Sequence, residues 1–138
     1  MKRHTLWILL AGTAVLAGGV ARAAETPADF LARYQNEARQ SAPGFSASAE
    51  RGEKFFTTTH GGEWSCSTCH TKNPAARGKH ANTGKAIEPM APAANPERLA
   101  STRSVEKWFG RNCKDVLGRV CTPAEKADVV AWLMNSPR

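Results

Sequence analysis

Five consecutive residues could hold a metal-bearing cofactor through covalent bonds. Cys66, Cys69 and His70 form the pattern C-x-x-C-H, in which two thiols three residues apart are followed at once by an imidazole. This pattern is the attachment signature of a c-type haem. The thiols would add to the porphyrin vinyl groups to give thioethers, and the histidine would bind the iron as its proximal ligand. The motif therefore predicts one covalent haem c.

Two other kinds of site also use a C-x-x-C pair. A thioredoxin-like redox pair needs a βαβ setting, and no strand-rich sequence flanks Cys66 and Cys69. A structural zinc site needs a second pair of ligands at suitable spacing. The other two cysteines, Cys113 and Cys121, are eight residues apart and have no histidine near them. The histidine directly after the second cysteine therefore favours haem attachment.

The first 23 residues have the features of a secretory signal peptide. A basic start at Lys2 and Arg3 precedes an apolar run over 6–20, and residues 21–23 supply a small-x-small cleavage site. We expect cleavage after Ala23 and export to a bacterial periplasm. No later segment is long and apolar enough to span a bilayer, so we expect a mature form without a membrane span. Residues 24–138 then make one small monohaem domain.

Net charge says little about partners. The precursor carries +7 at pH 7. Removal of the signal peptide, which holds three basic and no acidic residues, leaves +4. The sequence has no block of like charge and no aromatic–basic stripe, so a nucleic-acid partner is not expected. A basic rim that meets an acidic redox protein is compatible with this charge.

The elements that must position the motif are predicted to be helical. Capping patterns and apolar spacing predict helices over 27–41, over 48–57, from about 102 to near Gly110, and from 122 onward. Residues 71–100 show no lasting periodicity, and a loop of this length is expected to be functional, because a cofactor gives it something to wrap. We expect an all-α, cytochrome c-like domain of four or five helices around the haem, with the first and last helices packed together.

Several residues are candidates for the second axial position of the iron. A methionine thioether is the usual sixth ligand of monohaem cytochromes c, and Met90, flanked by prolines, is the obvious candidate. Met134 falls at helical spacing in the last helix and is interpreted as core. His60 and His80 would give bis-histidine ligation, but their surroundings are typical of solvated loop residues.

Two segments near the carboxyl terminus resemble the sphaeroides haem protein family of small, periplasmic, oxygen-binding c-type cytochromes. They are 105–113, which ends in Arg-Asn-Cys, and 118–128, which contains Cys-Thr-Pro. Shorter matches lie at 83–85 and 91–92, and the resemblance spans most of the mature chain. It implies a dihaem or other c-type cytochrome as electron donor, and a diatomic gas, oxygen or nitric oxide, as the ligand of the reduced haem.

Carried over residue by residue, the resemblance also implies a site. His70 is the proximal ligand, the side-chain oxygen of Asn112 is the distal ligand, and Cys113 and Cys121 form a disulfide. A disulfide also fits export and the even number of cysteines left after haem attachment. Met90 is a departure from the family's type protein, which has Leu at this position, so Met90 stays a rival ligand.

The two rival ligands predict different proteins. An amide oxygen is a hard, weak donor that favours ferric iron, so Asn112 would leave on reduction and open a position for a gas. A thioether is soft and favours ferrous iron, so Met90 would give an ordinary electron-transfer cytochrome c. A third class is an enzyme, such as a peroxidase or an oxygen or nitric oxide reductase, and its turnover would need an acid–base group beside the iron. No such histidine or carboxylate is identified, so no catalytic residue is assigned.

Overall fold

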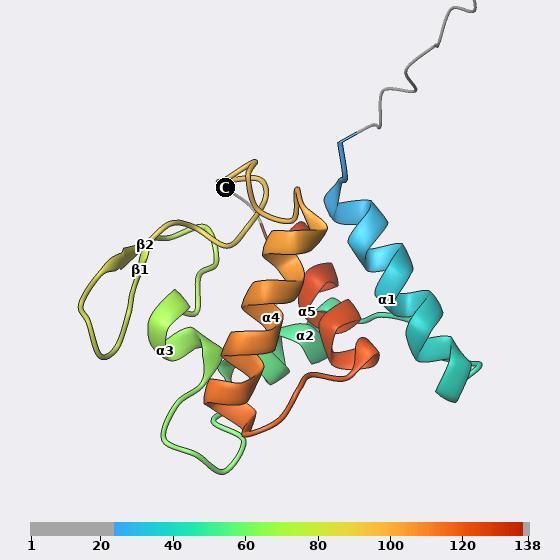
Figure 1. Ribbon diagram of the computed structural model, residues 1–138, viewed down its shortest axis with the longest axis horizontal. Helices are drawn as coiled ribbons and strands as arrows, with labels where there is room; N and C mark the ends of the chain where they lie inside the picture. Colours follow the sequence, from blue (N-terminus) through green and yellow to red (C-terminus); the bar gives the residue numbers. More distant parts are fainter. Residues whose placement is uncertain (1–23, 137–138) are drawn as a thin grey trace, which may run out of the picture.

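The computed structural model describes residues 24–136, and the predicted signal peptide lies outside this range. The described chain forms five helices and one short β-hairpin (Figure 1). In chain order these are α1 (Pro27–Ser41), α2 (Ala49–Thr57), α3 (Cys66–His70), β1 (Gly78–Lys79), β2 (Ala86–Ile87), α4 (Thr102–Leu117) and α5 (Pro123–Asn135). The predicted all-α class is confirmed. No helix within residues 24–136 has both the length and the apolar character needed to cross a membrane.

Helix α5 forms the centre of the fold. All of its residues 127–133 are buried, because both α1 and α2 pack against it. A helix buried on all sides is expected to be apolar all round. Tyr34 of α1 packs with Val130 in one cluster, and Phe56 of α2 packs with Trp132 in a second. The predicted packing of the first helix against the last is confirmed.

Two helix starts follow from capping residues. Thr26 caps α1: the Asp29 carboxylate accepts a hydrogen bond from the Thr26 N–H at 2.8 Å, and Pro27 occupies the first turn. At α5, the Glu125 carboxylate accepts from the Thr122 N–H at 2.8 Å. Each arrangement satisfies backbone N–H groups that have no partner inside the helix. Both predicted starts are confirmed.

Asp128 is the only charged residue in the buried stretch of α5, and it fixes α2 against α5. Its carboxylate accepts a hydrogen bond from the Ser48 N–H at 2.7 Å. It also accepts two from the Arg51 guanidinium, each at 2.8 Å. The Asp128 side chain is only 9% exposed, so these bonds supply what water no longer can. The same carboxylate therefore holds the start of α2 and the centre of α5 together.

Helix α4 is longer than the sequence predicts. The expected end near Gly110 is wrong: the helix continues to Leu117 and ends at Gly118, whose φ of 68° is left-handed. Glycine inside a helix costs about 1 kcal/mol relative to alanine. Burial of Val105 and Cys113 on the same helix offsets this cost. Tertiary packing therefore overrides the local preference of Gly110.

Residues 71–100 are mainly loop, as predicted, but contain a hairpin that the sequence does not reveal. The antiparallel register pairs Gly78 with Ile87 and Lys79 with Ala86. The hairpin lies directly on the motif helix, since a Cβ at Gly78 would come 2.1 Å from the Cys69 carbonyl oxygen. The hairpin and α3 lie at one end of the molecule and α1 at the other (Figure 1).

Candidate haem-binding site

The C-x-x-C-H motif is a short helix of its own. Helix α3 begins after Ser65, whose N–H donates to Oγ1 of Thr68 at 3.0 Å, and it ends at His70. Residues three and four apart lie on the same face of a helix. Cys66, Cys69 and His70 accordingly all line one cavity. The spacing of the motif thus brings the two thiols and the imidazole to one place.

This cavity has a volume of about 510 Å³ and lies between α2, α3, α4, α5 and the loop before α4. That volume is within the usual range of small-molecule and cofactor sites. The apolar part of the wall comes from α2, through Phe55 and Phe56, from α5, through Val129 and Leu133, and most of all from α4. The loop adds residues from 80 to 99. Residues of the 71–100 loop therefore line the cavity, and the wrapping of a cofactor by this loop stays a prediction.

The His70 imidazole is suited to bind a metal as a neutral ring. Burial lowers the pKa of His70 to about 4, and the nearby charge of Arg98 adds to this effect. The ring is therefore uncharged at neutral pH and keeps a lone pair for a metal. Its Nδ1 is the one buried side-chain polar atom of the described chain that has no hydrogen-bond partner. An imidazole left unsatisfied by protein groups is the chemistry expected of an iron ligand.

The two motif thiols complete a donor set that fits a covalent haem. Neither cysteine takes part in a disulfide, so both sulfur atoms are available to a cofactor. Burial raises the pKa of the Cys66 thiol to about 11, so this thiol is protonated at neutral pH. The Ala81 N–H donates to the sulfur of Cys69 at 3.3 Å, which ties the hairpin to the motif. Two thiols and a neutral imidazole on one apolar wall match the groups that a c-type haem requires.

Asn112 lies inside α4 and lines the same cavity. An isolated asparagine is usually a cap or turn residue, but the helix continues for five residues beyond it. Asparagine is a poor residue for a helix interior. Within residues 24–136 no hydrogen bond involves its side-chain amide, and the residue is only partly buried. The position thus offers an amide oxygen to the cavity and has no evident structural role.

Met90 also lines the cavity, in a different setting. Its N–H and that of Ala91 both donate to the carbonyl oxygen of Pro74, at 2.7 and 2.9 Å. Pro74 lies four residues beyond His70. Met90 also packs against the apolar cluster of Phe56 and Leu133. These contacts tie Met90 to the segment that follows the motif.

The remaining candidate ligands are placed less favourably. His60 is exposed, its Nε2 bonds to the Phe55 carbonyl oxygen at 2.7 Å, and it is not among the residues that line the cavity. His80 lies at the cavity edge, where its Nδ1 accepts from the Thr83 N–H at 3.3 Å. The interpretation of Met134 as core is wrong, because its side chain is 37% exposed. Met134 follows Leu133, the last buried residue of α5.

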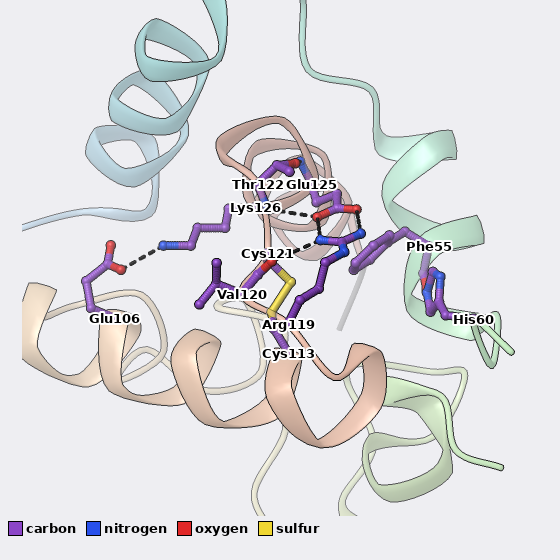
Figure 2. The surroundings of a disulfide bond; sticks show 10 residues. All are labelled: Phe55, His60, Glu106, Cys113, Arg119, Val120, Cys121, Thr122, Glu125 and Lys126. Atoms are coloured by element: carbon purple, nitrogen blue, oxygen red, sulfur yellow. Dashed lines mark hydrogen bonds and ion pairs between the residues drawn. A yellow bond between two sulfur atoms is a disulfide. The ribbon is translucent and has the colours of Figure 1, made fainter. Parts of the chain in front are cut away.

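Cys113 and Cys121 form a disulfide with a Cα–Cα distance of 5.6 Å, so the predicted pairing is confirmed. Figure 2 shows that it joins α4 to the segment leading into α5. The Arg119–Glu125 ion pair, at 2.7 Å, lies beside it. Asn112 is the residue immediately before Cys113. The disulfide therefore anchors the backbone next to Asn112.

Removing the disulfide should lower stability by a predictable amount. It closes a loop of about nine residues, for which chain entropy gives about 2.6 kcal/mol. We expect the variant Cys113→Ser/Cys121→Ser to lose about this free energy of unfolding, measured by denaturant titration. Wild-type protein whose disulfide has been reduced and alkylated is the control, and it should unfold at the same denaturant midpoint as the double variant. A reduced protein that unfolds at the same midpoint as the oxidised wild type would contradict the expectation.

Arg98 is a cavity residue that no local sequence signal marks. Its Nε donates to the Pro89 carbonyl oxygen at 2.9 Å, and its Nη2 donates to that of Glu88 at 2.9 Å. Burial lowers the pKa of Arg98. None of the described carboxylates forms an ion pair with it. A half-buried guanidinium with unused donors beside the cavity is suited to hold a haem propionate.

The fold and this donor set define a small all-α cytochrome of the c type. Comparison with known proteins agrees. A family model described as a domain of unknown function, DUF1924, matches residues 42–133. The chain is 45% identical over 125 residues to the cytochrome c-type protein SHP of Cereibacter sphaeroides, covering 88% of this chain and 92% of that protein. It is 40% identical over 111 residues to cytochrome c'' of Methylophilus methylotrophus, covering 77% of each.

Solved structures show the same relationship. Oxidised SHP, described as an oxygen-binding cytochrome c, matches with a TM-score of 0.71 and 45% identity over 79% of this chain and 96% of that one. Oxidised cytochrome c'' matches with a TM-score of 0.72 and 37% identity over 81% and 95%. The chain belongs to the sphaeroides haem protein family. It is a c-type cytochrome with one covalently bound haem.

Proposed function

We propose that this cytochrome is a periplasmic, gas-binding electron acceptor whose oxidised iron is held by His70 and Asn112. The haem would be attached through Cys66 and Cys69. The observation that carries the proposal is the unpartnered Asn112 amide, inside a helix and on the cavity that holds the motif. The gas ligand, oxygen or nitric oxide, is supported by the relative described as oxygen-binding. The periplasmic location rests on the signal sequence.

The chemistry follows from the character of the two protein ligands. The haem supplies one-electron and diatomic-ligand chemistry. The neutral His70 imidazole is a good donor to both oxidation states, whereas the Asn112 oxygen is a hard, weak donor suited to ferric iron. Asn112 would therefore leave on reduction. The related cytochrome c'' has a solution structure that addresses haem-ligand detachment, and this supports ligand release here.

An ordinary His/Met electron carrier is the second candidate function. It is favoured by one observation, that the Met90 side chain lines the same cavity. A thioether ligand would stay bound in the ferrous state and would leave no position for a gas. The electron donor would be a dihaem or other c-type cytochrome in either case. The two candidates therefore differ in ligation and not in the class of partner.

Absorption spectra of the two oxidation states test the proposal directly. With Asn112 as the releasable ligand, the ferric protein should be low-spin and lack the weak red band of His/Met ligation. The ferrous protein should be high-spin and should bind carbon monoxide without displacing a strong ligand. A His/Met cytochrome c measured in parallel is the control. A red ferric band together with a low-spin ferrous spectrum would contradict the proposal and favour Met90.

A further inference from the structure

We propose that the outer face of α4 is the docking surface for an acidic electron-donor protein. The surface, here named the α4 basic face, consists of Arg103, Lys107, Arg111 and Lys114, all of which are exposed. The inference rests on the proposed function in one respect, since it assumes that a protein delivers the electron. It adds where that protein binds and what charge its surface carries.

The periodicity of the helix gathers these cations. At 3.6 residues per turn, Arg103, Lys107 and Lys114 project within about 40° of one another, and Arg111 lies about 40° further round. Gly110 lies at the edge of this face, about 20° beyond Arg103, and a Cβ there would meet no atom within 4 Å. No internal packing therefore requires the glycine. The helix surface is low beside Arg103, so a partner backbone can approach this edge of the face closely.

The charge of this face is not neutralised within the described chain. The described ion pairs use other basic residues, namely Arg33, Arg51, Arg77, Arg119 and Lys126. Glu106 of the same helix points elsewhere, because its carboxylate binds the Lys126 ammonium at 2.7 Å and accepts from the Tyr34 hydroxyl. Asp115 is the one exposed acid of α4. The face therefore presents four positive charges beside one negative charge.

The face borders the haem cavity without belonging to it. Arg103, Lys107 and Lys114 do not line the cavity, so a bound haem would leave them exposed. Arg111 and Trp108 do line it and connect the two regions. Trp108 is 44% exposed, with the Lys107 ammonium 5.1 Å and the Arg111 guanidinium 5.9 Å from its ring centroid. Tryptophan and arginine are the residues most enriched at the energetic centres of protein interfaces.

An acidic redox protein fits this arrangement better than a lipid surface does. A membrane-binding helix would need a row of apolar side chains beside its cations, and Trp108 is the only large one exposed on α4. An electron donor needs both attraction over a distance and a final position next to the haem cavity. A positive face that borders the cavity meets both needs, because complementary charge steers association and fixes orientation.

Stopped-flow reduction by flavodoxin hydroquinone, an acidic redox protein used here as the probe, tests the proposal. The anionic hydroquinone passes one electron to the ferric haem and becomes the neutral semiquinone, so no proton moves. We compare wild type with Arg103→Glu/Lys107→Glu/Lys114→Glu. The matched control is Lys72→Glu/Lys79→Glu/Lys85→Glu, which makes the same change of charge at exposed residues around the hairpin.

We expect the α4 variant to lose about tenfold or more of the second-order rate constant at low salt, with the difference vanishing at high salt. The matched control should lose clearly less. Equal losses in the two variants, or a larger loss in the control, would overturn the proposal. So would loss of binding to phosphatidylglycerol vesicles with an unchanged reduction rate, since that result identifies a membrane surface.

Two further measurements keep the test decisive. The ferric spectrum of each variant reports folding and axial ligation separately from docking, so failure of the Asn112 proposal would be seen there and not in the salt dependence. If the triple variant does not fold, Lys107→Glu alone replaces it. This single variant should reduce both the rate at low salt and the slope of rate against ionic strength, and an unchanged slope would overturn the proposal.

Discussion

Replacing Asn112 by alanine should convert the oxidised protein from low-spin to high-spin haem, while Met90→Leu should leave the ferric spectrum nearly unchanged. The first change removes the proposed hard oxygen donor, and the second keeps an apolar side chain of similar size. Loss of a ligand that stabilises ferric iron should also raise the reduction potential, by about 60 mV for each tenfold loss of ferric preference. Absorption and electron paramagnetic resonance spectra measure the spin state, and redox titration measures the potential.

Asn82→Ala, at an exposed position of the hairpin, is the matched control for removing an asparagine amide. It should change neither the spin state nor the potential. The opposite pattern is equally clear. Should Met90→Leu abolish the low-spin ferric signal while Asn112→Ala retains it, the protein is an ordinary His/Met electron carrier and the proposed ligation is wrong.

Gly52→Ala should cost about 3 kcal/mol of stability or more, the upper range for overpacking. A Cβ at this position would lie 2.0 Å from the carbonyl oxygen of Asp128 and 3.0 Å from Cβ of Trp132. Backbone atoms of a buried helix cannot give way as a flexible side chain can. Helix α2 would have to move off α5, and Phe56, which lies 6.0 Å from the His70 ring, would move with it. Denaturant titration should show the loss, and the haem spectrum should be perturbed.

Gly110→Ala is the matched control, since it makes the same substitution inside a helix where the added Cβ meets open space. This variant should gain up to about 1 kcal/mol, because alanine is the better helix former. Equal effects of the two substitutions would show that close approach of α2 to α5 does not determine the stability at Gly52.

Local signals predicted the parts of the fold that depend on neighbouring residues. The capping boxes at Thr26 and Thr122 fix where two helices begin, and both act within three residues. The helix over the motif, α3, was not among the helices that the sequence predicted. The end of α4 could not be found in this way. Gly110 marks a stop by propensity, and only the burial of Val105 and Cys113 against other elements carries the helix past it.

The residues of the candidate site also differ in whether local sequence reveals them. The motif alone points to Cys66, Cys69 and His70, because the C-x-x-C-H spacing is the signature of haem attachment. Asn112 was found only through the family resemblance. If the helix ended near Gly110, as predicted, Asn112 would be a cap or turn residue. Arg98 could not be found from sequence, because its position depends on a folded loop whose carbonyl groups accept its hydrogen bonds.

The Cys113–Cys121 bond changes the competition that an external ligand meets. By fixing the backbone beside Asn112, the disulfide keeps the proposed ligand near the iron even when the two are not bonded. Rebinding of the amide is then intramolecular, and the amide has a high effective concentration at the iron. An external ligand for the ferric protein, such as azide, must therefore compete with the Asn112 amide at that effective concentration. Cutting the disulfide would lengthen the tether, lower the effective concentration of the amide and strengthen the apparent binding of azide.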